Sequence, residues 1–232
     1  MMALLFLRGA LFLVIVGFLM MPVPGASAAS TSASVIEDIV GKVDARYAQT
    51  KDLQADFVQE TILEGFTTGF TSSGRLYLKK PGLLRWDYLH PSEEQIYVDG
   101  DQVMMYVPEH QQVVKGALTQ MAASKGPLAL LQGAGNLSQQ FTILESTDGS
   151  KDAGKFPSLT LVPKPVGQTP PTIKKIVLKL FPDTYFIQGI TLFEVSGNIS
   201  RVMFDHIQAN TGLSSSQLTF DVPSDVVVVE LP

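Results

Sequence analysis

The sequence of 232 residues contains no cysteine. This absence excludes thiol catalysis, metal sites with cysteine ligands and a lipid-modified N-terminal cysteine, so the protein is not itself a lipoprotein. Positive charge is also in short supply, because 17 Lys and Arg residues face 22 Asp and Glu residues. An acidic chain without a dense basic stripe argues against binding to nucleic acid and against electrostatic docking on anionic lipid.

Enzyme motifs are missing as well. The sequence has no H-E-x-x-H, no G-x-S-x-G, no P-loop and no dinucleotide-binding fingerprint. Its three histidines, His90, His110 and His206, lie far apart without metal-ligand spacing. His206 falls in a strand pattern and is expected to be a half-buried structural residue rather than a base; the pair Glu93-Glu94 is expected in a solvated turn. Catalytic groups can also converge from distant positions, so these absences favour binding over catalysis without deciding between them.

The N-terminal segment has the composition of an export signal. Arg8 is the only charged side chain before an apolar run over residues 10–21, residues 22–25 contain two prolines and a glycine, and Ala26-Ser27-Ala28 supplies small residues. This pattern predicts a signal peptide, residues 1–28, that is cleaved after Ala28. The alternative is an uncleaved anchor, for which the run falls short of the roughly 20 residues that span a bilayer.

Removal of the signal leaves residues 29–232, which suit one domain that buries roughly 70% of its unfolded surface. A small polar tether, 29–33, is followed by Ser34-Val35-Ile36-Glu37, a capping box. Apolar residues then recur at helical spacing and predict an amphipathic helix over 35–48. A second, short helix is expected over 127–131, because proline suits its first position and Gly133 follows its end.

From Leu53 onward the apolar period changes to two, which predicts strands. The segments with strand character are 56–63, 67–80, 84–88, 95–98, 103–107, 111–114, 141–145, 158–162, 173–181, 185–193, 199–209 and 217–222. We expect about eleven strands among them, joined mostly by short turns such as Asp99-Gly100. Antiparallel neighbours of this kind predict a mainly β fold: one highly curved sheet or half-barrel with helices over its concave face.

The most informative stretch is SGRLYLKKPGLLRWDY, residues 73–88. It is followed by Pro91, by IYVDG at 96–100 and by VMMY at 103–106. This order resembles the family of periplasmic outer-membrane lipoprotein carriers, LolA. In that family a G-x-L-x-x-K-R-P-x-x-x-x-W block leads, past a further proline, to a D-G hairpin and an aromatic strand.

Two flanking segments extend the resemblance to residues 34–226. Asp56-Phe57-Val58-Gln59 resembles the F-x-Q strand that follows the first helix of the family, and the segment from Phe220 through Pro223 to Val226 resembles its closing F-x-x-P-x-x-V element. Each piece is moderately specific by itself. The ordered set is far more specific, and it is joined here to an export signal in a chain that lacks cysteine.

The resemblance implies an unclosed antiparallel β-barrel with helices as a lid over a hydrophobic cavity. It further implies a monomeric, non-enzymatic periplasmic carrier without a cofactor or bound metal. Such a carrier accepts acylated lipoproteins from an inner-membrane ABC transporter and delivers them to an acceptor at the outer membrane. Two alternatives stay open: a periplasmic lipid-binding or lipoprotein-sensing module of the same fold, and a lipid-modifying hydrolase with a nucleophile–base pair inside the cavity.

Apolar strand side chains are the candidates for contact with acyl chains, and each has ordinary core packing as its alternative. The candidates are Phe57, Leu76, Leu78, Leu84, Trp86, Tyr88 and Met105. Met105 adds a flexible, polarizable side chain that can adapt to acyl chains of different shape. For Trp86 the two roles weigh evenly, because its place in the family block offsets the usual core role of a lone tryptophan.

The resemblance also supplies candidates for the lid and its gating. They are Lys80, Ile36, Ile39, Val43, Leu130 and Leu131. Lys80 stands where the family usually has an arginine that is associated with lid contacts and with handing cargo onward. Lysine keeps the charge but lacks the planar five-donor fork, so bidentate bonding to lid carbonyls is unavailable. The plain alternative for Lys80 is a solvated charge at a strand end, and the leucines can be lid or core.

Overall fold

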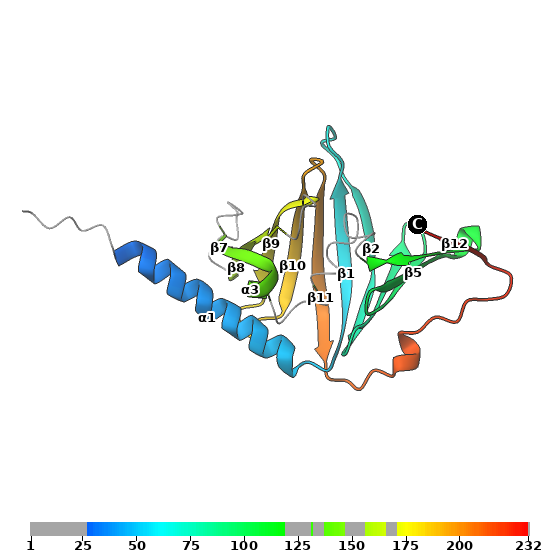
Figure 1. The fold of residues 1–232 in the computed structure, drawn as a ribbon, viewed down its shortest axis with the longest axis horizontal. Coiled ribbons are helices and arrows are strands. Elements are labelled where there is room, and N and C mark those ends of the chain that lie inside the picture. The colour runs from blue at the N-terminus through cyan, green and yellow to red at the C-terminus, as the bar shows by residue number, and fades with distance from the viewer. Residues whose placement is uncertain (1–26, 119–130, 132–136, 147–155, 166–170, 232) are drawn as a thin grey trace, which may run out of the picture.

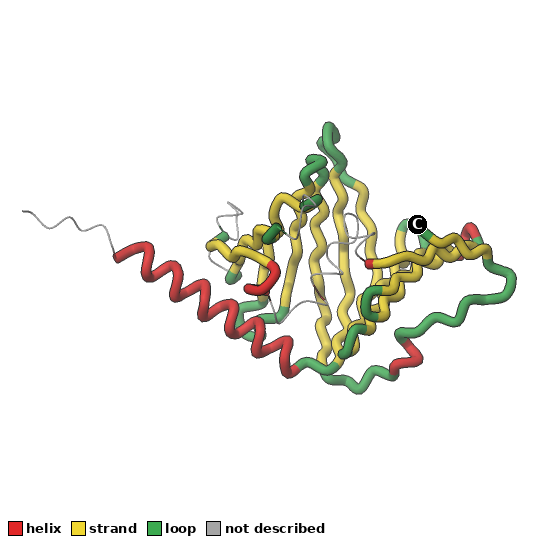
Figure 2. The backbone as a smooth tube through the Cα atoms, in the orientation of Figure 1, coloured by secondary structure: helices red, strands yellow, loops and turns green. Residues whose placement is uncertain are grey.

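The computed structural model describes residues 27–118, 131, 137–146, 156–165 and 171–231. Segments with alternating apolar side chains form one continuous twelve-stranded sheet in it (Figures 1 and 2). The strand order is β12-β6-β5-β4-β3-β2-β1-β11-β10-β9-β8-β7. Neighbouring strands are antiparallel except β12 and β6, which are parallel. The strands β7 and β12 end the sheet without pairing to each other, so the barrel is unclosed and the predicted fold class is confirmed.

Most strands begin and end within a few residues of their predicted positions. Their bounds are β1 Asp52–Ile62, β2 Phe70–Lys79, β3 Leu83–His90, β4 Glu94–Asp99, β5 Gln102–Val107, β6 Gln112–Ala117, β7 Phe141–Glu145, β8 Ser158–Pro163, β9 Ile173–Leu180, β10 Ile187–Glu194, β11 Ile199–Ala209 and β12 Val227–Glu230. Asp99-Gly100 forms the predicted tight turn between β4 and β5, with Gly100 at φ +59°. Such a positive φ suits glycine because it has no Cβ.

The helix α1 spans Ser27–Gln49 and is longer than predicted. Its first turn lies before Ser34, so the prediction that the capping box starts the helix, after a polar tether, is wrong. Extending a helix costs much less than nucleating one, and the alanines of the segment 27–33 favour extension. The short helix α3 spans Leu137–Gln140, and the 3₁₀ turns η1 and η2 span Pro108–His110 and Ser215–Gln217. In the described part of the chain, no helix is both long and apolar enough to cross a bilayer.

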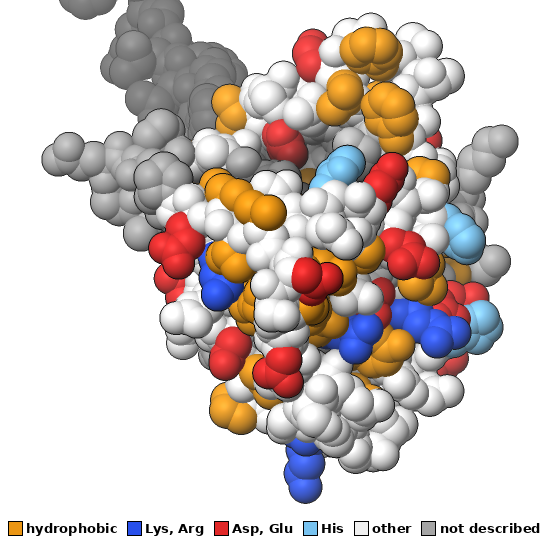
Figure 3. All heavy atoms as spheres, turned by 90° about the vertical axis from the view of Figure 1, so that its right-hand side faces the viewer, with side chains coloured by type: hydrophobic (Ala, Val, Ile, Leu, Met, Phe, Trp, Pro, Cys, Tyr) orange, Lys and Arg blue, Asp and Glu red, His pale blue; other side chains and the backbone are white. Residues whose placement is uncertain are grey.

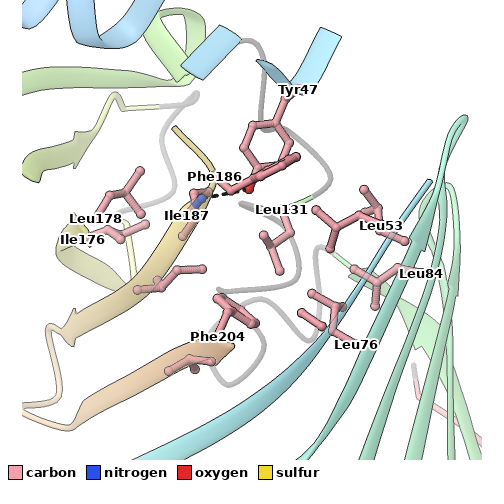
Figure 4. Packing of buried hydrophobic residues seen from close by; sticks show 14 of the residues in the cluster. Tyr47, Leu53, Leu76, Leu84, Leu131, Ile176, Leu178, Phe186, Ile187 and Phe204 are labelled. Atoms are coloured by element: carbon pink, nitrogen blue, oxygen red, sulfur yellow. Dashed lines mark hydrogen bonds between the residues drawn. The ribbon is translucent and has the colours of Figure 1, made fainter. Parts of the chain in front are cut away.

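The strand register places apolar residues in rows across the concave face of the sheet. Leu76 on β2 pairs with Trp86 on β3, and Trp86 pairs with Ile96 on β4. The same face of β9 and β10 carries Leu178 and Ile190, which also pair with each other. Figure 4 shows side chains from both halves of the sheet meeting in one cluster beneath the end of α1.

Gly74, the first glycine of the 73–88 block, stands where the fold leaves no room for a side chain. Gly74 on β2 lies so close to β3 that a Cβ at this position would stand 1.8 Å from the carbonyl oxygen of Asp87. No side chain fits there, because contacts to backbone atoms cannot be relieved by a rotamer change. The close approach brings Phe57 and Tyr88, which flank Gly74 in the register, toward each other over the concave face.

The predicted strand over 217–222 is wrong. After β11 the chain crosses the convex face of the sheet as an extended segment, here called the strap (residues 210–226), and only then forms β12 beside β6 (Figure 1). Leu218 is 1% exposed, and the Phe220 ring centroid lies 5.0 Å from those of Tyr97 and Tyr106. The strap therefore covers a second apolar cluster, separate from the core on the concave face.

His206 is exposed rather than half-buried, which corrects the expectation from the strand pattern. Two residues of β11, His206 and Ile207, lie opposite the single residue Ala55 of β1 in a β-bulge, with His206 at φ +51°. The bulge turns the imidazole outward, where its Nδ1 lies 3.0 Å from Asp56 Oδ2 and its side chain is 73% exposed. A bulge re-aims side chains without changing the apolar alternation that precedes it.

Candidate functional site

Five of the seven predicted cavity residues are buried in the core of the concave face, and the other two, Tyr88 and Met105, are partly buried against it. The buried five are Phe57, Leu76, Leu78, Leu84 and Trp86. The structure therefore brings the predicted set together on one face. Phe204 of β11 and Leu53 of β1 belong to the same cluster and were not predicted, although Leu53 lies between the polar residues Asp52 and Gln54.

An aromatic group forms the centre of this face. The ring centroids of Phe57 and Trp86 are 4.4 Å apart, and those of Trp86 and Phe204 are 6.0 Å apart. Trp86 is 2% exposed. The Tyr88 hydroxyl donates to Gln59 Oε1 over 2.7 Å, and burial raises the pKa of Tyr88, so the phenol stays neutral. The face is thus apolar and uncharged at its centre.

The helix α1 packs on the side of this face that β7 to β10 form. Val43 is 0% exposed and Tyr47 2%, while Ile36 and Ile39 are partly buried against the core. Tyr47 was not singled out from the sequence. Its ring meets that of Phe186 edge-on at 5.7 Å, and its hydroxyl accepts a 3.3 Å hydrogen bond from the backbone N–H of Ile187 (Figure 4).

Lys80 lies directly after β2 and reaches the end of the lid. Its ammonium donates to the carbonyl oxygen of Tyr47, in the last turn of α1. Burial lowers the pKa of Lys80, because the charged form loses water there. On the other side of the same turn, Arg46 Nε donates to the Thr184 carbonyl over 2.7 Å. Lys80 is therefore tied to the lid by a single ammonium contact rather than lying as a free charge at a strand end.

The segment between β6 and β7 also reaches the concave face. Leu118, Leu131 and Leu137 belong to the core cluster, and Leu131 is 4% exposed. Figure 4 places Leu131 between Ile187 on one half of the sheet and Leu53 on the other. The other leucine predicted for the lid, Leu130, lies outside the described residues, as does most of the predicted helix over 127–131. Leu131 itself packs where a lid would cover the face.

Metal chemistry has no visible basis in the described ranges, where no three His, Asp or Glu side chains gather closely enough to hold an ion. On the side of the molecule that carries the strap, apolar, acidic and basic side chains are interspersed, and no charged or apolar patch of one kind stands out (Figure 3). The concave face under α1 is accordingly the candidate site, and its chemistry is the burial of apolar groups.

Comparison with known proteins places this site in a family. The family model "Outer membrane lipoprotein carrier protein LolA" matches residues 48–221. The outer-membrane lipoprotein carrier protein of Methylococcus capsulatus is 31% identical over 180 residues, which cover 78% of this chain and 82% of that protein. The carrier of the same name from Pseudomonas aeruginosa PAO1 is 28% identical over 207 residues, covering 89% and 93% of the two chains.

Among solved structures, an uncharacterized conserved protein from Thermus thermophilus matches with a TM-score of 0.51. The match covers 84% of this chain and 98% of that one, at 14% sequence identity, and so supports the fold alone. The family match spans the strands that carry the aromatic centre, the Lys80 turn and the start of the strap. The chain belongs to the LolA family of outer membrane lipoprotein carrier proteins.

Proposed function

We propose that this protein is a non-enzymatic periplasmic carrier that shelters the acyl chains of lipoproteins between the inner and the outer membrane. In this proposal residues 1–28 are a signal peptide that is removed on export, and residues 29–232 are the single carrier domain. The carrier receives acylated lipoproteins from an inner-membrane ABC transporter and passes them to an acceptor at the outer membrane. The side chains in contact with acyl chains are those of the concave face: Phe57, Leu76, Leu78, Leu84, Trp86, Tyr88 and Met105.

One observation carries the proposal: a wide apolar face is packed on one side by a helix that buries Val40, Val43 and Tyr47 against it and is held by few polar contacts. Large buried side chains line the face from β1 to β4 and from β8 to β11. The polar contacts between the end of α1 and the sheet side include those of Lys80, Arg46 and Tyr47, and a 3.4 Å hydrogen bond from Asn210 Nδ2 to the Gln49 carbonyl. A lid of this kind can exchange its own apolar contacts for those of a ligand at modest cost.

The energetics favour exchange. Each methylene of an acyl chain gains roughly 0.8 kcal/mol when it leaves water, so a lipoprotein with tens of methylenes cannot cross an aqueous space unshielded. The closed lid buries Val43 and Tyr47 on the same surface, so lid closure and cargo binding compete for it. A ligand shifts such an equilibrium only by its differential affinity for the open state, which means that a weakly held lid binds cargo and still releases it.

Analysis of the lipids that copurify with the exported protein tests the proposal. The protein is purified from the periplasm without detergent, extracted with organic solvent, and analysed by mass spectrometry together with its polypeptide fraction. We expect triacylated lipoprotein in the extract, in a molar amount that rises with the molar amount of carrier. Phospholipid or glycolipid in its place would support the alternative of a lipid-binding module with a different ligand and would contradict the carrier role.

A further inference from the structure

The concave face changes from apolar to polar along β1. Its buried apolar residues end at Phe57, and the next two positions on this face, Gln59 and Thr61, are polar and partly exposed. The strand register places Ser72 of β2 opposite Gln59, and Ser200 of β11 opposite Thr61. These four side chains form a polar band (Gln59, Thr61, Ser72 and Ser200) across three neighbouring strands, directly beside the aromatic centre of the face.

The side-chain amide of Gln59 organises this polar band. Its Nε2 donates to Ser200 Oγ over 3.0 Å and to Thr61 Oγ1 over 3.3 Å, and its Oε1 accepts the 2.7 Å hydrogen bond from the Tyr88 hydroxyl. A hydroxyl can accept one hydrogen bond and donate another. Because Ser200 and Thr61 accept from Gln59, each keeps its own proton for a further acceptor. The polar band therefore presents two positioned O–H donors to a ligand on the concave face.

Nearness to water does not explain the polar band, because the face becomes apolar again beyond it. Phe70 of β2 lies opposite Thr61 and is 65% exposed, as is Val195 in the turn between β10 and β11. The backbone N–H of Glu64, in the turn between β1 and β2, donates to Asn198 Oδ1 over 3.0 Å, so the two turns lie side by side at one end of the sheet (Figure 1). The polar band thus separates a buried apolar region from an exposed one.

We propose that the polar band binds the ester carbonyls of the diacylglyceryl group on the N-terminal cysteine of the cargo. The acyl chains then lie toward Phe57, and the polypeptide leaves past the two hairpin turns. This rests on the proposed carrier function and adds to it the orientation of the cargo. Phospholipids carry the same ester carbonyls, but the side chains of the polar band are uncharged, so a phosphate would find no cationic partner among them. A glyceryl group linked to sulfur by a thioether is neutral and fits this chemistry.

A pair of lipidated peptides tests the hydrogen bonds. Both are fluorescent cysteinyl peptides of neutral sequence with two glyceryl-linked chains of equal length, joined by esters in one and by ethers in the other. The purified exported protein should bind the diester about tenfold more tightly than the diether, because two hydrogen bonds to carbonyl oxygens are lost in the diether. The double variant Thr61→Val/Ser200→Ala should bind both peptides with the affinity of the wild type for the diether.

The matched control is Thr71→Val. Thr71 is exposed on the opposite face of the β1–β2 hairpin, so the same change of side chain should leave the preference for the diester intact. Valine suits a strand at least as well as threonine does, so these variants keep the fold.

Photo-crosslinking tests the orientation of the cargo. The diester peptide carries a benzophenone side chain on the residue that follows its cysteine, and the crosslinked positions are identified by mass spectrometry after digestion. We expect crosslinks within residues 63–70 or 195–198. Crosslinks chiefly within α1 would overturn the orientation.

The outcomes separate the polar band from the carrier function. Equal affinity of the wild type for the two peptides, or an unchanged preference in the double variant, would overturn the polar band and leave the carrier function standing. A wild-type protein that binds neither peptide would overturn both. Phosphatidylcholine with the same acyl chains serves as a competitor. If it binds as tightly as the diester peptide, with the same dependence on Thr61 and Ser200, the assignment to lipoprotein cargo is wrong.

Discussion

Lys80 shows how one residue can alter the strength of a contact while keeping its place in the fold. The family usually has arginine at this position, and the lysine still reaches the last turn of α1, where it donates to the Tyr47 carbonyl. An ammonium is a compact point charge, whereas a guanidinium can bind two acceptors at once. The last turn of α1 is therefore held at this point by a weaker contact than an arginine would give.

Removal of the Lys80 contact to the Tyr47 carbonyl should raise the affinity of the protein for cargo. Lys80→Met keeps the length of the side chain and loses the donor, which removes about 1 kcal/mol from the closed lid and raises affinity for a fluorescent fatty acid roughly fivefold. Lys80→Arg, the matched control, keeps a cationic donor and should bind no more tightly than the wild type. Equal affinity in Lys80→Met and the wild type would show that the contact does not hold the lid.

Asp52 should give the protein a measurable sensitivity to acid. Burial acts to raise the pKa of Asp52, but hydrogen bonds from the Thr211 and Gly212 N–H groups outweigh it and lower the pKa below the ordinary value of 3.8. The unfolded chain therefore binds more protons than the folded protein as the pH falls. This stabilisation is complete above the unfolded pKa and is lost as the pH falls through the folded pKa.

Thermal unfolding against pH measures the effect. The midpoint of the wild type should fall on acidification below about pH 5, most steeply below the unfolded value of 3.8. Asp52→Asn should be less stable near neutral pH and should lose less stability across the same range. Parallel curves for the two proteins would mean that Asp52 does not hold the start of the strap through its charge.

Single residues also mark where prediction from sequence ends. The alternation of β1 and β3 placed Phe57 and Trp86 correctly on the concave face, because period-two burial follows from strand geometry alone. His206 was misplaced because a bulge changes the face that a side chain takes without leaving a mark in the apolar pattern. The polar contacts of Lys80 and Tyr47 depend on where α1 ends in space, which no local pattern contains.

At the scale of elements, the strap explains the one strand that was predicted and is absent. Leu218 and Phe220 alternate with polar residues as in a strand, and both do point toward the sheet. Alternation reports an extended, half-buried segment, but a strand also needs a neighbour with free backbone groups. The strap lies across the convex face, where Arg85 Nη1 donates to the Gln217 carbonyl over 3.0 Å instead of a regular ladder.

The two faces of the sheet should respond differently to mutation. Leu218→Ala should lower the free energy of unfolding by about 2–5 kcal/mol, because it empties a fully buried site. The folded fraction should still bind a fluorescent fatty acid with wild-type affinity, since Leu218 lies on the convex side. Chemical denaturation and titration measure the two effects. Loss of binding in the folded variant would contradict the assignment of the acyl site to the concave face alone.

At the scale of the whole molecule, the sheet surrounds one apolar cluster without closing into a barrel. A closed barrel of this size would have no free edges, whereas here β7 and β12 end the sheet and α1 packs on the β7–β10 side of the concave face. The curved sheet was predictable because its strands and short turns are local features. The pairing of β11 with β1 and the pairing of β12, after the strap, with β6 were not predictable, because both depend on long-range contacts.

The central claim, that the concave face carries lipoprotein acyl chains, is tested most directly by release of lipoproteins from spheroplasts of the source cell. The exported protein is added to spheroplasts, and newly made lipoprotein in the supernatant is measured against Leu78→Asp, in which a carboxylate replaces an apolar side chain 5% exposed on that face. Leu218→Ala serves as the matched control for stability. We predict release by the wild type and by Leu218→Ala, and none by folded Leu78→Asp. Equal release by Leu78→Asp and the wild type, or no release by the wild type, would contradict the claim.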